Sequence, residues 1–312
     1  MRTSVVVVGS GMMGSGIGAM SALAGNKTIL VDTSPERAEA GREKAYTAIK
    51  ERLENGLCSA KAAKNAELLI EASGDIESSC EKAFLVIEAI VEILEAKQEM
   101  FRQLDAMLPE DVPILSNTSG LRITDIAAMT KHPERTVTTH FWLPAHLVPL
   151  VEVVMGDKTS ETVALKVKEI LIEWDKAPVL VRKDLPGQLA NRVLQAIIRE
   201  CVDIVSSGIA SAEDVDTAIK MGMAVRFPAW GPLQHIDAVG LDLALSVQNT
   251  VLPDICAEQS GGDYLKNLVS DGNFGYKTGK GFYDWSVHNM DDAIKNRNDF
   301  IIYAVKYLTN RS

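Results

Sequence analysis

Long hydrophobic runs are absent from this sequence of 312 residues. No apolar stretch approaches the ~20 residues that a helix needs to cross a bilayer, which excludes a membrane-spanning helix. The chain begins with Met1-Arg2-Thr3 and enters an apolar run at once, so we expect no secretory signal. These features predict a cytoplasmic protein that has no membrane partner.

Positive charge is also scarce. The sequence has 32 lysines and arginines against 42 aspartates and glutamates, which gives a formal net charge of −10 at pH 7. A nucleic-acid-binding protein needs a basic face to neutralise phosphates. The charge balance therefore argues against a nucleic-acid partner.

Cysteine is rare and scattered. The four residues, Cys58, Cys80, Cys201 and Cys256, show none of the CxxC spacings that are typical of metal or redox sites. We expect reduced and mostly buried thiols, as in other intracellular proteins. The sequence therefore predicts neither a disulfide nor a metal site.

A glycine-rich turn between two apolar runs is the most informative feature that is present. The run Ser4–Val8 leads into Gly9, Gly11 and Gly14, and a second apolar run ends at Asp32. This order of strand, glycine turn, helix and acid is the dinucleotide-binding fingerprint. The first glycine makes the tight turn, the second lets the backbone approach a pyrophosphate, and the third allows close packing of helix and strand. We assign cofactor binding here to Gly9, Gly11, Met12, Met13, Gly14 and Asp32.

The acid at the end of the second strand bears on which cofactor binds. The Asp32 carboxylate is placed to accept a hydrogen bond from a ribose 2′-hydroxyl and to repel a 2′-phosphate, so NAD is favoured over NADP. Similar glycine turns occur in SAM-dependent methyltransferases and in plain turns. The strand before this turn, the helix after it and the spacing to the acid favour NAD.

Strand and helix patterns alternate through the first part of the chain. Charged, helix-forming residues at about 36–67, interrupted by Gly56, predict a helical hairpin, and Glu92–Leu108 and Thr159–Trp174 predict further helices. This alternation predicts an α/β domain over residues 1–185, a Rossmann-type doubly wound and mainly parallel sheet. Its strands are expected at Leu68–Ala72, Phe84–Ala89, Pro113–Ser116, Val137–His140, Leu150–Val154 and Ala177–Val181, in addition to the two N-terminal runs.

The pattern changes at Pro186, after which strand signals disappear. Apolar residues recur at helical spacing over Leu189–Val205, Ala212–Lys220 and Leu233–Leu252, and again in a final helix between about residue 286 and the C-terminus. We therefore predict an all-helical domain over residues 186–312.

Five short motifs in a fixed order carry a family resemblance. They are Ser116-Asn117-Thr118-Ser119, His140-Phe141-Trp142-Leu143-Pro144, Val151-Glu152-Val153, Pro186-Gly187 followed by Asn191-Arg192, and Lys277-Thr278-Gly279-Lys280-Gly281-Phe282-Tyr283. Together with the glycine turn, over about residues 3 to 285, they resemble the 3-hydroxyacyl-CoA dehydrogenase family. The resemblance implies an NAD-binding domain followed by a helical domain that forms a homodimer.

The resemblance also implies a catalytic set. His140 matches the general base that removes the proton of the 3-hydroxyl, and Glu152 matches its carboxylate partner. Ser119 matches the serine that binds the substrate oxygen, and Asn191 matches an amide that helps to hold the substrate. The chemistry is consistent, because imidazole titrates near neutral pH and a neighbouring carboxylate fixes its tautomer. Cofactor contacts on the nicotinamide side are implied for Glu92, Lys97, Ser119 and Lys277.

Two departures from the family bear on the substrate. Leu143 replaces an asparagine that the family usually has three residues after the histidine, which makes the nicotinamide end of the site less polar. The segment 222–232 carries Arg226 and looks like the branch that contains lambda-crystallin and L-gulonate 3-dehydrogenase. Arg226 is suited to a substrate carboxylate. Because the lysines of the helical hairpin are balanced by acids, we favour a small 3-hydroxy acid over a CoA thioester and keep both open.

Structural interpretations of the same residues stay open at this point. Glu152 alternates with apolar neighbours and is also compatible with a solvent-facing position, Asn191 with a polar surface, and Arg226 with an ion pair. Trp142 and Trp230 are typical of packing, and either is also compatible with the wall of a substrate pocket. Functionally, the main hypothesis is an NAD-dependent dehydrogenase that interconverts a 3-hydroxy compound and its 3-keto product. The alternative is a non-catalytic, crystallin-like NAD-binding protein with a structural or regulatory role.

Overall fold

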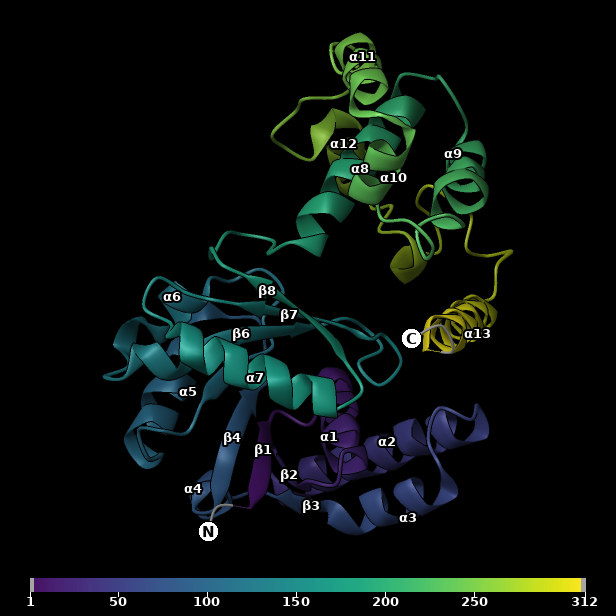
Figure 1. Ribbon diagram of the computed structural model, residues 1–312. Helices are drawn as coiled ribbons and strands as arrows, with labels where there is room; N and C mark the ends of the chain where they lie inside the picture. Colours follow the sequence, from purple (N-terminus) through teal and green to yellow (C-terminus); the bar gives the residue numbers. More distant parts are fainter. Residues whose placement is uncertain (1–2, 310–312) are drawn as a thin grey trace. The chain divides into compact units, whose positions relative to one another are not determined.

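A computed structural model describes residues 3–309 and divides the chain into two compact units (Figure 1). The first unit extends to Ala190 and the second begins at Asn191. No helix in the described residues has the length and apolar character that crossing a membrane requires.

The first unit is built on one sheet of eight strands in the order β3-β2-β1-β4-β5-β6-β7-β8. All neighbouring strands are parallel except β6 and β7, which pair antiparallel. The strands are β1 (Ser4–Val8), β2 (Lys27–Val31), β3 (Ile70–Ser73), β4 (Ala83–Glu88), β5 (Ile114–Ser116), β6 (Thr136–Phe141), β7 (Leu150–Val154) and β8 (Ala177–Val181). The predicted Rossmann-type α/β fold is confirmed. Each strand begins within two residues of its predicted first residue.

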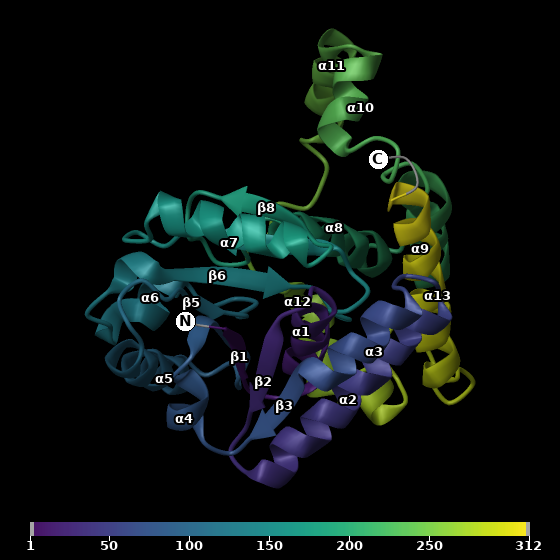
Figure 2. The ribbon, with the colours of Figure 1, turned by 60° about the horizontal axis from the view of Figure 1, so that its bottom comes forward.

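Helices cover both faces of this sheet because side chains alternate along each strand. Val5 and Val7 of β1 pack in one apolar cluster, and Val6 and Val8 pack in another. The first cluster includes residues of α1 (Met12–Leu23), α2 (Pro35–Glu54), α3 (Ala60–Leu69) and α7 (Glu161–Glu173). The second includes residues of α4 (Ile76–Cys80), α5 (Leu94–Met107) and α6 (Ile123–Ile126), which Figure 2 shows apart from α1–α3.

The predicted helical hairpin is present as α2 and α3. Helix α2 begins after Ser34, whose hydroxyl accepts a hydrogen bond from the Arg37 N–H at 3.3 Å. It ends just before Gly56, which has a φ of +66°. Helix α3 is capped in the same way by Ser59. The capping serines and Gly56 therefore determine where this hairpin begins, breaks and resumes.

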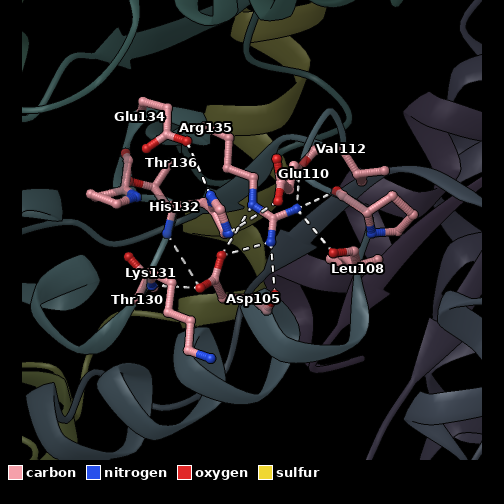
Figure 3. A network of polar contacts seen from close by, with 12 residues as sticks. Asp105, Leu108, Glu110, Val112, Thr130, Lys131, His132, Glu134, Arg135 and Thr136 are labelled. Carbon is pink, nitrogen blue, oxygen red and sulfur yellow. Dashed lines mark hydrogen bonds and ion pairs between the residues drawn. The ribbon is translucent and has the colours of Figure 1, made fainter.

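The start of β6, the strand that carries His140, is fixed by a buried ion pair (Figure 3). Arg135 immediately precedes β6 and contacts the Asp105 carboxylate of α5 at 2.6 Å, and both side chains are almost fully buried. Its guanidinium also donates to the carbonyl oxygens of Leu108, Pro109 and Val112. These bonds connect the end of α5 to the entrance of β6.

The second unit is helical, as predicted, but the sequence missed several boundaries. The predicted helix Leu233–Leu252 is two helices, because Gly240 between them has a φ of +104°. The predicted helix Ala212–Lys220 stops at Ala218 and continues as a π-helical segment, Ile219–Ala224. Helix α12 was not predicted. The helices are α8 (Ala190–Ser206), α9 (Ala212–Ala218), α10 (Pro232–Val239), α11 (Leu241–Val251), α12 (Gly262–Ser270) and α13 (Met290–Thr309).

Candidate active site

The sheet reverses its strand order between β1 and β4, which is where doubly wound folds bind dinucleotides. β1 leads to β2 on one side, and β4 leads to β5 on the other. The carboxyl ends of β1 and β4 are joined by a hydrogen bond from the Ala89 N–H to the Val8 carbonyl at 2.7 Å. The glycine turn begins at this edge.

Two of the three glycines of the turn, Gly9 and Gly14, leave no room for a side chain, and the third, Gly11, lies in open space. Gly9 has a φ of +96°, and a Cβ there would lie 2.6 Å from the Ala89 oxygen. A Cβ on Gly14 would lie 1.8 Å from the Gly9 oxygen and 3.4 Å from a Val7 methyl, so helix and strand are in close contact. A Cβ on Gly11 would meet nothing within 4 Å. The turn is therefore open at Gly11, where the fingerprint places the pyrophosphate.

The amino end of α1 fits an anionic ligand. Gly11 is the N-cap, no side chain caps the helix, and its first turn contains no acid. The first backbone N–H groups of a helix have no intrahelical acceptor and attract negative charge. Met12, 70% exposed, and Met13 occupy the first two helical positions. These residues fit an NAD pyrophosphate, as the sequence predicts.

Asp32 lies at the carboxyl end of β2 and accepts hydrogen bonds from three residues. Its Oδ2 accepts from the Ser10 N–H at 2.9 Å and the Ser10 hydroxyl at 2.8 Å. Its Oδ1 accepts from the Thr33 N–H at 2.8 Å and from Arg37 Nε at 2.9 Å. Burial raises the pKa of Asp32, but the bonds from Thr33, Ser10 and Arg37 lower it far below its usual range. The carboxylate therefore stays ionised.

His140 and Glu152 form a buried pair at the carboxyl end of β6. The two residues lie directly opposite each other in the antiparallel pairing of β6 and β7, which places both side chains on one face. His140 Nδ1 lies 2.7 Å from Glu152 Oε2. Glu152 is completely buried, so the solvent-facing alternative is excluded. With Nδ1 bound to the carboxylate, Nε2 is the ring nitrogen left for proton transfer.

Glu152 accepts three further hydrogen bonds. The Trp142 indole donates to Oε2 at 3.1 Å, and the N–H groups of Leu189 and Ala190 donate to Oε1 at 2.8 Å each. Burial raises the pKa of Glu152, but the bonds from His140, Ala190, Trp142 and Leu189 together lower it to about 2. The ionised form therefore stabilises the fold above the ordinary carboxyl range, and this contribution is lost as the pH falls toward 2.

Ser119 and its neighbours are organised by Glu92. Glu92 Oε1 accepts from the Ser119 N–H at 2.9 Å, the Gly120 N–H at 3.2 Å and the Thr118 hydroxyl. Burial raises the pKa of Glu92, but these bonds and Lys97 lower it. Lys97 is fully buried, and its Nζ lies 3.3 Å from Glu92 Oε2. The structure therefore brings Glu92, Lys97 and Ser119 together, as expected for one site.

A second acid completes this network, and sequence reasoning missed it. Glu88 at the end of β4 is fully buried and accepts from Lys97 Nζ at 2.6 Å, the Ile90 N–H at 2.7 Å and the Ser116 hydroxyl at 2.7 Å. Trp142, interpreted as a packing residue, was missed in the same way. An acid inside an otherwise apolar strand was a signal for Glu88, whereas nothing in the sequence indicated that the Trp142 indole reaches Glu152.

Two buried basic side chains hold the loop 142–149 that follows His140. Lys176 Nζ donates to the carbonyls of Ala145 and Val148, and Arg52 Nη1 donates to the carbonyl of His146 at 2.7 Å. Burial and the nearby Arg52 lower the pKa of Lys176 to about 7. Within this loop Leu143 is 45% exposed and presents an apolar surface.

Asn191, Arg226 and Lys277 belong to the second unit. Asn191 Oδ1 accepts from Gln195 at 3.3 Å, and Arg226 Nε donates to the Gly222 carbonyl at 3.1 Å. Lys277 is exposed in a short 3-10 turn, Tyr276–Thr278. The geometry of the His140 site comes from first-unit residues, and the roles of these three residues stay predictions.

Family models match almost the whole chain. The NAD-binding domain of 3-hydroxyacyl-CoA dehydrogenase matches residues 4–185, and the C-terminal domain of the same enzymes matches residues 187–285. The chain belongs to the 3-hydroxyacyl-CoA dehydrogenase family. It is therefore an NAD-dependent oxidoreductase that acts on a hydroxyl group.

Relatives of this chain within the family are named for different substrates. A probable 3-hydroxybutyryl-CoA dehydrogenase of Bacillus subtilis is 38% identical over 90% of this chain and 96% of that protein. A 5-formyl-3-hydroxy-2-methylpyridine 4-carboxylate 5-dehydrogenase of Mesorhizobium japonicum is 30% identical over 91% of both.

Solved structures show the same two kinds of enzyme. A structure of a 5-formyl-3-hydroxy-2-methylpyridine 4-carboxylic acid 5-dehydrogenase, described as an NAD⁺-dependent dismutase, matches all of both chains with a TM-score of 0.92 and 28% identity. A (S)-3-hydroxybutyryl-CoA dehydrogenase of Ralstonia eutropha matches 91% of this chain and 99% of its own, with a TM-score of 0.74 and 29% identity. The resemblance of the segment 222–232 to the lambda-crystallin branch stays a prediction.

Proposed function

We propose that this chain oxidises a 3-hydroxy acid, or its CoA thioester, to the 3-keto compound, with His140 as general base and Glu152 as its partner. The observation that carries the proposal is the buried His140–Glu152 pair, at 2.7 Å, on the same edge of the sheet as the glycine turn. Bound NAD supplies the acceptor for the hydride that leaves the carbinol carbon. The remaining chemistry is proton transfer and orientation by the protein.

The proton is the part of the reaction that the chain itself handles. An alcohol gives up hydride readily only as its hydroxyl proton is removed, so a base must lie beside the reacting oxygen. His140 takes that proton at Nε2 and becomes an imidazolium. Glu152, ionised and held by four hydrogen bonds, stabilises this charge without moving. In the reverse reaction the imidazolium returns the proton to the keto oxygen.

Ser119 and Asn191 complete the proposed substrate contacts. The Glu92 carboxylate fixes the backbone at Ser119, so the serine hydroxyl is held on a rigid turn where it donates to the substrate oxygen. Asn191 follows Ala190, whose N–H binds Glu152, and we assign its amide to the substrate. Contacts of Glu92, Lys97, Ser119 and Lys277 with the nicotinamide half of NAD belong to the same proposal.

Of these two substrate classes, we favour a small carboxylic acid over a CoA thioester. The match of both full chains to a pyridine-carboxylate dehydrogenase supports this choice. In the helical hairpin, Lys50 Nζ lies 3.7 Å from Glu54 Oε1. This carboxylate offsets the positive charge that Lys50 would otherwise offer to CoA phosphates. Arg226 is proposed to bind the substrate carboxylate, since a guanidinium can hold both oxygens.

A substrate screen that follows NADH absorbance tests this function. Free 3-hydroxy acids are expected to be oxidised with a higher kcat/KM than their CoA esters, and Arg226→Ala is expected to raise KM for the acids about tenfold or more. Arg297→Ala, an exposed arginine bonded to Asn298, is the matched control and should behave as wild type. Unchanged KM in Arg226→Ala would refute the carboxylate contact. NADH binding without any turnover would favour the structural or regulatory alternative.

A homodimer formed by the helical unit is also part of the proposal. Helices α8, α10, α11 and α12 contain no buried residue. Large apolar side chains lie exposed along them, among them Leu233 at 77%, Leu241 at 59% and Leu245 at 60%. Exposed apolar surface on this scale is typical of a covered interface. A second copy of the chain, in the cytoplasm, is the proposed cover.

Sedimentation velocity tests the dimer. The wild-type protein is expected to have twice the mass of one chain, whereas Leu241→Asp/Leu245→Asp, a pair one turn apart on α11, should shift it to the monomer by placing charges in the interface. Leu68→Asp, which changes a leucine on α3 that is still more exposed, at 78%, is the control and should remain dimeric. A monomeric wild type would refute this part of the proposal.

A further inference from the structure

Arg37 is a charged residue at the predicted adenosine site to which no role has been assigned. It is the third residue of α2, and its Nε donates to Asp32 Oδ1 at 2.9 Å. Its side chain is 70% exposed, whereas that of Asp32 is only 10% exposed. The guanidinium therefore covers the one carboxylate that the fingerprint assigns to the ribose 2′-hydroxyl.

The bond changes the charge that a cofactor meets at this position. Asp32 alone would present a negative charge to the 2′ position of the ribose and exclude a phosphate there. With Arg37 paired to it, the two charges cancel at short range. Of the guanidinium nitrogens, only Nε has a hydrogen-bond partner among the described residues. The two Nη groups, on an exposed side chain, are left for an anion.

Some groups near Arg37 favour a bound phosphate, and others oppose it. The hydroxyl groups of Thr33 and Ser34 lie next to Asp32 in the chain, and α2, twenty residues long, begins here with its positive end. Glu36, exposed in the first turn of α2, carries a negative charge that repels an anion. A hydrogen bond with Ser34 lowers the pKa of Glu36 and so keeps this carboxylate ionised. Asp32 also keeps its negative charge. NAD therefore remains the better cofactor.

We propose that Arg37 determines cofactor selectivity in this enzyme by offsetting Asp32, so that the chain also binds a dinucleotide with a 2′-phosphate, the NADP type, with lower affinity. The guanidinium moves from Asp32 Oδ1 to the phosphate, which it can bind with two parallel N–H groups. When NAD binds, the ribose hydroxyl competes with Arg37 for Asp32. Loss of Arg37 therefore affects the two cofactors differently.

Equilibrium titrations of the full-length protein with NADH and NADPH, followed by nucleotide fluorescence, test the proposal. Wild type should bind both, with NADH tighter. Arg37→Ala should weaken NADPH binding about tenfold and change the Kd for NADH by less than about threefold, because only the phosphate loses a charged partner. Arg37→Lys, which keeps the charge without the planar fork, should give an intermediate Kd for NADPH. NADPH binding to wild type should also weaken more steeply with added salt than NADH binding.

Arg42→Ala is the matched control. Arg42 lies five residues further along α2 and is paired with Glu39, so its removal should leave both Kd values unchanged. No NADPH binding by wild type would overturn the proposal, as would an equal NADPH affinity in wild type and Arg37→Ala. Either result would leave the NAD-dependent reaction and the role of His140 intact, because NADH binding and turnover are measured separately.

Discussion

Replacing His140 with alanine is expected to lower kcat by about 10²–10⁴ while the Kd for NADH stays close to that of wild type. Nε2 of His140 is the proposed proton acceptor, so its removal takes away the general base. The histidine lies on β6, and β4 and β5 separate this strand from β1, whose glycine turn the fingerprint assigns to the pyrophosphate. Steady-state kinetics with the best substrate of the screen and a fluorescence titration with NADH give the two quantities.

His132→Ala is the control for this experiment. His132 precedes β6, is partly exposed, and contacts Glu110 and Glu134 without reaching the site. The His132→Ala variant should keep wild-type turnover.

The dependence of turnover on pH is expected to lack a contribution from Glu152. Because the pKa of Glu152 is about 2, this carboxylate is ionised at every assay pH and does not add its own titration to the pH profile of wild type. If His140→Ala turned over at the wild-type rate, the assigned mechanism would be wrong.

Replacing Arg135 with methionine is expected to lower the free energy of unfolding by about 3–5 kcal/mol. The substitution leaves the buried Asp105 carboxylate without its cation and leaves the carbonyls of Leu108 and Val112 without their shared donor. Burial raises the pKa of Asp105, but Arg135 and the N–H groups of Lys131 and His132 lower it. Urea denaturation measures the loss. The stability of wild type should fall as the pH is lowered and Asp105 becomes protonated, because the ionised form is the stabilising one.

Two further variants make this result interpretable. Arg102→Met removes an exposed arginine that pairs with Glu99 and should leave the urea midpoint nearly unchanged, since such surface pairs contribute little. Arg135→Met/Asp105→Leu replaces both charges with apolar groups and should recover much of the stability that the single variant loses. A single variant as stable as wild type would show that the network in Figure 3 does not hold β6 in place.

Local sequence predicted the first unit well because its signals are short. Valines that alternate between two faces, serine caps and glycines at tight turns act within a few residues, so β1, α1 and the α2–α3 hairpin follow from nearby side chains. The second unit was predicted less well. The apolar spacing continues across residue 240, and only the positive φ of Gly240 separates α10 from α11.

Contacts between distant residues decided the chemistry of the site. The sequence by itself determined that a glycine turn ends in Asp32, that His140 lies at the end of a strand and that Glu152 lies on the next one. The antiparallel register of β6 and β7 brought the histidine and the glutamate together, and the turn at 187–190 aimed two N–H groups at Glu152. The fold also placed Trp142 on Glu152 and Arg37 on Asp32. Side-chain direction and strand register depend on how the whole sheet packs, which is why only the tertiary structure could decide them.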